Sequence, residues 1–172
     1  MKTGTWLCSA LCSLARFFLM TLVNSSTKLV NMEKRKEPRR VVLYADDDID
    51  DLDFVRDAFK PHEKDIKLIT FCGALELIRY ISEQPVNEPS PCLVILDVDM
   101  PELNGKEALM LLRKIDRYKQ VPVILFTTSS SPHDEVYADC YRAGFFTKPL
   151  NEEQMNIIVE KFVSYCNEGV KK

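Results

Sequence analysis

Residues 41–51, VVLYADDDIDD, join an apolar run directly to a cluster of aspartates. The run at residues 41–45 has the β-branched and aromatic composition that is typical of a strand. Further runs of this kind follow at residues 66–71, 92–97, 121–127 and 145–147. Three of the five are almost continuously apolar, which is expected of strands that are buried on both faces of a parallel sheet. The chain from residue 41 onward therefore predicts a parallel β-sheet.

The segments between these runs have the apolar period of helices. The apolar positions are Ala74, Leu77, Ile78 and Ile81, then Ala108, Leu111, Leu112 and Ile115, and finally Met155, Ile158, Val159, Phe162, Val163 and Cys166. Five strand–helix units are too few for a closed eight-unit barrel. Right-handed crossovers then predict an α/β fold, a doubly wound open sheet with helices on both faces. In such a fold the functional site lies at the carboxyl ends of the strands.

Polar side chains stand where these strands end. Asp46 and Asp47 follow the first strand, Asp97 ends the third, Thr127 the fourth, and Lys148 follows the fifth. Carboxylates about 4 Å apart repel by roughly 4 kcal/mol per pair at an effective dielectric of 20, so the cluster favours a hard cation such as Mg²⁺. One carboxylate oxygen would then be free to attack a phosphorus, and the Thr127 hydroxyl and Lys148 would hold the phosphoryl oxygens.

Two further aspartates, Asp50 and Asp51, are interpreted as negative charges in the first turn of a helix. Each would contribute about 0.3–1 kcal/mol through the helix dipole.

On these residues the chain resembles a receiver domain of the two-component response regulators, of the chemotaxis-type single-domain kind. The resemblance extends from about residue 41 to residue 166. The matching features are Asp46-Asp47 after Val-Val-Leu-Tyr-Ala, Asp97 with Met100-Pro101 and Gly105 behind it, Thr127 after Val121-Pro122-Val123, and Lys148-Pro149. The resemblance implies a flavodoxin-like (βα)5 fold with five parallel strands in the order 2-1-3-4-5.

The resemblance also implies a role for each site residue. Asp97 would accept the phosphoryl group. Asp47 and Asp97 would bind Mg²⁺ together with the backbone carbonyl of Asp99, and Asp46 would act on the metal largely through water. Thr127 and Lys148 would bind the phosphoryl group, Phe145 would be the aromatic switch residue, and the Lys148–Pro149 bond would be cis.

The family's partners follow from the same resemblance. A sensor histidine kinase or histidine phosphotransfer protein would donate the phosphoryl group, and the signal would leave through contact with a downstream protein. The protein would be a signalling switch rather than an enzyme, and a monomer or a phosphorylation-dependent dimer.

Two other classes of protein share parts of this pattern. Asp97-Val98-Asp99 matches the Asp-x-Asp nucleophile of haloacid-dehalogenase-type, Mg²⁺-dependent phosphohydrolases. In that family Asp-x-Asp comes first and the acidic pair last, whereas here the pair comes first. A calcium-binding loop beginning at Asp46 would need glycine at its sixth position, where Asp51 stands. The order of the motifs favours the receiver over both.

Charge is divided unevenly along the 172-residue chain, whose net charge is −3. Residues 1–40 hold eight Lys and Arg against two Glu, a net charge of +6, and the remaining residues carry −9. The acidic part argues against broad nucleic-acid binding, because it could not neutralise phosphates. The six cysteines contain no C-x-x-C pair and are predicted to be reduced, buried thiols of a cytoplasmic protein.

The change from a basic to an acidic composition near residue 40 suggests two regions, a basic extension at residues 1–38 and the receiver domain at residues 39–168. Arg16 interrupts the apolar run at residues 6–23, whose 18 residues are at the short end of what a membrane span needs, so a membrane anchor is not favoured. Residues 1–31 are interpreted as an over-extended start, with Met32 as the natural beginning.

Overall fold

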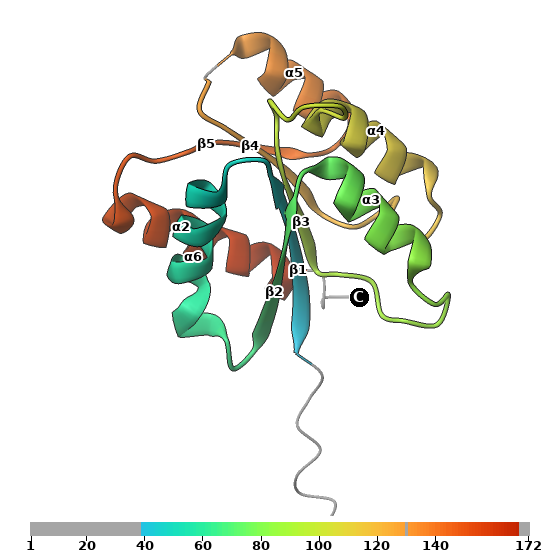
Figure 1. Ribbon diagram of the computed structural model, residues 1–172, viewed down its shortest axis with the longest axis horizontal. Coiled ribbons are helices and arrows are strands. Elements are labelled where there is room, and N and C mark those ends of the chain that lie inside the picture. The colour runs from blue at the N-terminus through green and yellow to red at the C-terminus, as the bar shows by residue number, and fades with distance from the viewer. Residues whose placement is uncertain (1–38, 130, 169–172) are drawn as a thin grey trace, which may run out of the picture. The chain divides into compact units, whose positions relative to one another are not determined.

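The computed structural model describes residues 39–129 and 131–168. These residues contain one sheet of five parallel strands in the order β2-β1-β3-β4-β5 (Figure 1). The strands are β1 (Arg40–Asp46), β2 (Ile66–Cys72), β3 (Leu93–Asp97), β4 (Val123–Thr127) and β5 (Gly144–Thr147). The predicted fold class and strand order are confirmed.

Helices cover both faces of the sheet. They are α2 (Ile49–Phe59), α3 (Ala74–Glu83), α4 (Gly105–Lys114), α5 (Pro132–Cys140) and α6 (Glu152–Glu168), with a short 3₁₀ helix η1 (Lys60–His62) after α2. Helices α2 and α6 pack on one face, and α3, α4 and α5 on the other (Figure 1). Every residue of β3 and β4 is buried between these layers, which explains their unbroken apolar sequences.

The turn from β3 into α4 fixes the position of Asp97. Asn104 caps α4 in a reciprocal capping box with Glu107. A Cβ atom on Gly105, the first residue of the helix, would lie 2.0 Å from the backbone oxygen of Asp97. Only glycine therefore allows α4 to begin directly against the carboxyl end of β3.

A disulfide corrects the expectation of reduced cysteines. Cys92 directly precedes β3, and Cys166 is buried on α6. Their sulfur atoms form a disulfide, and their Cα atoms lie 4.8 Å apart. They are 74 residues apart in sequence, so no local pattern signals their contact. Cys72 and Cys140 are free and exposed.

Among the described residues, no helix is both long and apolar enough to cross a bilayer. The interpretation of residues 1–31 and of Met32 concerns positions outside the described part of the chain.

Candidate functional site

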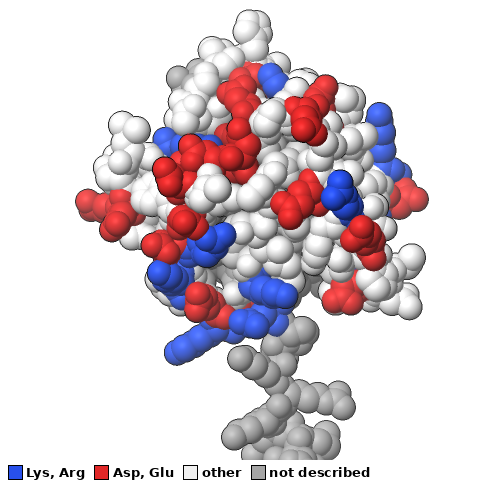
Figure 2. All heavy atoms as spheres, in the orientation of Figure 1, with Lys and Arg blue, Asp and Glu red and all other residues white. Residues whose placement is uncertain are grey.

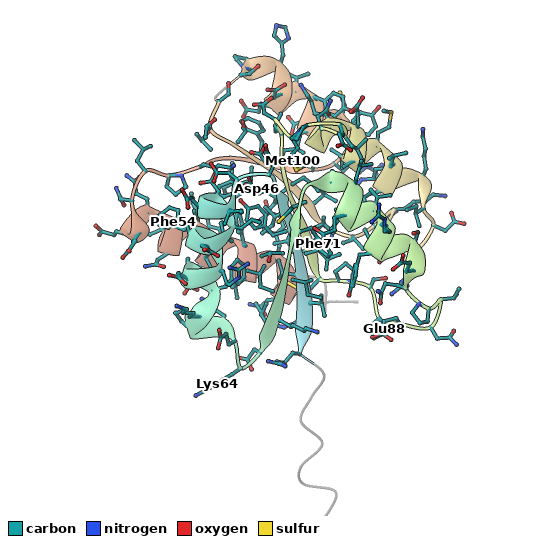
Figure 3. The ribbon with its side chains drawn as sticks, viewed as in Figure 1. Asp46, Phe54, Lys64, Phe71, Glu88 and Met100 are labelled. Atoms are coloured by element: carbon teal, nitrogen blue, oxygen red, sulfur yellow. A yellow bond between two sulfur atoms is a disulfide. The ribbon has the colours of Figure 1, made fainter. Side chains whose placement is uncertain are left out.

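Three carboxylates meet at the carboxyl edge of the sheet. Asp46 is the last residue of β1, Asp47 follows it, and Asp97 is the last residue of the neighbouring β3. Each offers an oxygen within 4.8 Å of the other two; Asp46 and Asp97 are buried and Asp47 is exposed. Figure 3 shows Asp46 at this edge, with Lys64 towards the opposite end of the sheet. The structure thus brings together the three carboxylates that the sequence predicted to be neighbours.

Asp46 is held by donors from its own strand and from the turn after it. The Tyr44 hydroxyl donates to Oδ2 of Asp46, and the backbone N–H of Asp48 donates to Oδ1 at 3.1 Å. Burial and the charge of Asp46 raise the pKa of Tyr44 well above its ordinary value, so the hydroxyl keeps its proton. Tyr44 is a site residue that was not predicted, although side chains two positions apart on a strand lie on the same face.

Asp97 is held in a similar way. Its Oδ2 accepts a hydrogen bond from the backbone N–H of Asp99 at 2.8 Å, and its Oδ1 lies 2.8 Å from the ammonium of Lys148. Burial raises the pKa of Asp97 above its ordinary value, and the hydrogen bond from Lys148 counteracts that shift. The Asp99 side chain itself is exposed, so its expected part in the site would involve only its backbone.

Lys148 reaches the carboxylates from the loop after β5. Its ammonium lies 2.7 Å from Asp46, 2.7 Å from Asp51 and 2.8 Å from Asp97, and its side chain is only 9% exposed. Burial alone would lower the pKa of Lys148, but hydrogen bonds to the three carboxylates raise it above the ordinary value. The lysine is therefore charged and partly neutralises the acidic site.

The peptide bond between Lys148 and Pro149 is trans, so the expected cis bond is wrong. The lysine is positioned by contacts with its neighbours instead. Its backbone N–H donates to the carbonyl oxygen of Thr127 at 2.7 Å, and its ammonium binds the three carboxylates.

Thr127 and Phe145 lie on the two remaining strands. Thr127 ends β4, one residue beyond the partner of Asp97, and its fully buried hydroxyl accepts a hydrogen bond from the N–H of Ser129 at 3.1 Å. Phe145 lies on β5 and packs, half-buried, against the core on the side of α3, α4 and α5. The predicted threonine and lysine are thus at adjacent strand ends.

Asp51 was assigned only to the first turn of a helix. It does lie in the first turn of α2, yet its carboxylate also binds Lys148. Only Asp48 stands between the acidic pair and this helix, where it acts as the N-cap. Because only one residue links the acidic pair to α2, the sequence could have indicated that the first turn of α2 lies next to the site.

The donor set fits a hard divalent cation. Its side-chain ligands are carboxylate oxygens, and such oxygens suit Mg²⁺, which keeps several waters and binds one or two carboxylates directly. Figure 2 shows acidic side chains gathered over the N-terminal end of α2. The field at this edge of the sheet therefore attracts cations.

A doubly wound sheet with carboxylates, a threonine and a lysine at its carboxyl edge defines the receiver class of signalling domains. Residues 42–160 match the family of the response regulator receiver domain, and the chain belongs to this family. Family membership gives the chain a signalling role and implies contact with histidine kinases or phosphotransfer proteins. It gives no support to the phosphohydrolase alternative.

Several relatives resemble the whole receiver region. The response regulator Rcp1 of Synechocystis sp. is 27% identical over 146 residues, which cover 81% of this chain and 97% of Rcp1. The crystal structure of the Mn²⁺-bound form of response regulator Rcp1 is 26% identical, with a TM-score of 0.63 over 73% of this chain and 92% of that one. The phosphorylated cyanobacterial phytochrome response regulator RcpA has the same fold, at 20% identity and a TM-score of 0.68 over 78% of this chain and 98% of that one.

Other relatives match only in part. The protein-glutamate methylesterase/protein-glutamine glutaminase of Treponema denticola is 32% identical over 77 residues, which cover 43% of this chain and 20% of that protein. This match carries no esterase activity to the present chain.

Proposed function

We propose that the protein is a phosphoryl-accepting switch of a two-component phosphorelay, with Asp97 as the site of phosphorylation. The observation that carries this proposal is the placement of Asp97. It is a buried carboxylate at the end of a central strand, and it lies against Asp46, Asp47 and the ammonium of Lys148. Asp46, Asp47 and Asp97, with the backbone carbonyl of Asp99, would hold Mg²⁺.

The chemistry of the transfer follows from these positions. A carboxylate oxygen of Asp97 attacks the phosphorus of a partner's phosphohistidine, the phosphorus–nitrogen bond breaks, and the electron pair leaves with the imidazole. The product is an acyl phosphate on Asp97. A bound Mg²⁺ would supply positive charge between the carboxylates and the incoming phosphoryl group. Lys148 and the hydroxyl of Thr127 would bind the phosphoryl oxygens, and Lys148 also keeps Asp97 from being repelled by its neighbours.

The output of the switch would be a change of binding surface. Movement of Thr127 and Lys148 towards the phosphoryl group would be transmitted through Phe145 to the surface formed by α5, β5 and α6. The protein would act in the cytoplasm through contact with a downstream protein, as a monomer or a phosphorylation-dependent dimer. It would have no enzymatic activity besides its own phosphorylation and dephosphorylation.

Residues 39–168 form the proposed receiver domain, and residues 1–38 its N-terminal extension. Support comes from the family match at residues 42–160, which lies entirely within residues 39–168.

The test is phosphorylation by a small phosphodonor in the presence of Mg²⁺. Wild-type protein should take up an acid-stable, base-labile label, and Asp97→Asn should take up none. Asp116→Asn is the matched control, because Asp116 is an exposed carboxylate whose ion pair in the described part of the chain is with Lys119. Label on Asp97→Asn equal to that of the wild type would overturn the assignment. Sustained hydrolysis of a generic phosphomonoester by the wild type would instead favour the phosphohydrolase.

A further inference from the structure

Asp51 is a carboxylate at the phosphoryl site that does not belong to the cluster of possible metal ligands. It lies in the first turn of α2, and its Oδ2 is 2.7 Å from the ammonium of Lys148. Its side chain is 34% exposed, whereas the other two carboxylates that contact Lys148 are almost fully buried. Asp51 is therefore the partner of Lys148 that water can reach.

The ammonium of Lys148 has no spare donor. A lysine ammonium carries three N–H bonds, and three carboxylates lie within 2.8 Å of it. A phosphoryl group on Asp97 brings oxygens that need a donor from this same ammonium. One of the three contacts must then weaken, and the contact with Asp51 is the easiest to give up because water can solvate its carboxylate.

We propose that Asp51 competes with the phosphoryl group for Lys148, and so limits how readily the site accepts phosphate. This inference rests on the function proposed above. In the unphosphorylated state Asp51 holds the ammonium from the side of α2. When Asp97 carries a phosphoryl group, the ammonium of Lys148 gives up its contact with Asp51 and donates that N–H to a phosphoryl oxygen instead. Asp51 is thus a positioning residue that acts through Lys148.

The sign of the effect follows from the charges. Replacing Asp51 with asparagine removes a negative charge near the phosphoryl oxygens and frees a donor of Lys148, and both changes favour the phosphoryl group. We expect Asp51→Asn to bind beryllofluoride, a phosphoryl mimic, about fivefold more tightly than the wild type in saturating Mg²⁺. A fivefold change in affinity corresponds to the free energy that a partly exposed ion pair typically contributes.

A neighbouring residue provides the matched control. Asp50 lies in the same first turn of α2, is exposed, and has no ion pair in the structure among the described residues. Asp50→Asn makes the same change in net charge and in the charge near the helix N-terminus. It should leave beryllofluoride affinity within about twofold of the wild type. Asp51→Glu keeps the negative charge and should also stay close to the wild type.

The experiment is a calorimetric titration of the full chain and the three variants with beryllofluoride, and separately with Mg²⁺ alone. Tighter beryllofluoride binding by Asp51→Asn than by Asp50→Asn, with unchanged Mg²⁺ affinity, supports the inference. Equal affinity of these two variants overturns it. Weaker binding by Asp51→Asn also overturns it, because the residue would then assist Lys148 rather than compete for it. A wild type that binds no beryllofluoride in Mg²⁺ refutes the proposed function itself, and the inference with it.

Discussion

Replacing Lys148 with alanine should strongly destabilise the protein when no divalent cation is present. The ammonium lies 2.7 Å from a carboxylate oxygen of Asp46 and 2.8 Å from one of Asp97. Both carboxylates are almost completely buried, so water cannot replace the lysine as their partner. The variant would leave two buried negative charges facing each other.

The structure sets the size of the effect. Oxygens of Asp46 and Asp97 lie within 4.8 Å of each other, and two charges at that distance repel by about 3 kcal/mol at an effective dielectric of 20. Breaking a buried ion pair by removing one partner typically costs about 3–5 kcal/mol. We therefore expect the free energy of unfolding to fall by about 3 kcal/mol, which lowers the Tm of a domain of this size by about 10 °C.

The loss should depend on pH in a defined direction. Burial raises the pKa of Asp97, and Lys148 opposes that shift more strongly than the backbone N–H of Asp99, which also lowers the pKa. A carboxyl group whose pKa is raised in the folded state stabilises the fold while it is protonated, and this contribution disappears as the pH rises through the folded pKa. The defect of Lys148→Ala should therefore be greatest at neutral pH and smaller in mild acid.

The assay is thermal unfolding in EDTA and in Mg²⁺, with Lys64→Ala as the control. Lys64 is an exposed lysine in the turn between η1 and β2, far from the site (Figure 3), so its loss changes the net charge equally. Saturating Mg²⁺ should restore most of the stability of Lys148→Ala, because the cation supplies the missing positive charge. Equal unfolding temperatures of Lys148→Ala and Lys64→Ala in EDTA would show that Lys148 does not stabilise the buried carboxylates.

Two further predictions concern Asp47, the exposed carboxylate of the proposed metal site, and the disulfide. Mg²⁺ at about 100 times its dissociation constant should stabilise the wild type by about 2.7 kcal/mol. In thermal unfolding, Asp47→Ala should lose most of this stabilisation by Mg²⁺, and in EDTA it should be at least as stable as the wild type. If Mg²⁺ stabilises Asp47→Ala as much as the wild type, Asp47 is not part of the metal site. Cys92→Ser should lower the free energy of unfolding in denaturant titrations by about 2–4 kcal/mol under oxidising conditions, since it opens a bond between residues 74 apart. Cys140→Ser, at a free and exposed thiol, is its control, and equal stability of the two variants would show that the disulfide does not form.

Much of the fold could be predicted because a parallel sheet leaves a strong local pattern. Strands β3 and β4 are buried at every residue, so their sequences are apolar throughout and bounded by polar groups. The boundaries were predicted less well at β4, which begins at Val123 rather than at residue 121. The preceding Pro122 has no N–H to donate to the ladder, although its carbonyl accepts from Val94 at 3.0 Å. The strand order came from the family resemblance, because the apolar runs alone do not fix which strands are neighbours.

The site was predicted where its residues are strand ends, and missed where contacts depend on tertiary packing. Asp46, Asp97, Thr127 and Lys148 stand at or just after the carboxyl ends of parallel strands. The predicted runs were therefore enough to place them at one edge of the sheet, and the strand order from the family resemblance made them neighbours. The contact of Asp51 with Lys148 joins residues 97 positions apart and depends on how α2 packs against the sheet. A local rule assigned Asp51 correctly to a helix start, but could not show that this helix end faces the lysine.

The charges of the proposed phosphoryl site give the physical reason why Asp51 would affect phosphorylation. Asp46, Asp47 and Asp97 carry three negative charges and Lys148 one positive charge, so a divalent cation would bring this set close to neutrality. An acyl phosphate on Asp97 bears two negative charges where the free carboxylate bears one. The three aspartates, Lys148 and the divalent cation then have a net charge of about −1. Asp51 adds a further negative charge for as long as it remains against Lys148. Release of this carboxylate to water removes its repulsion from the phosphoryl oxygens and leaves the full charge of the ammonium for them. The carboxylate that water can reach is therefore the part of the site best suited to respond when the phosphoryl group arrives.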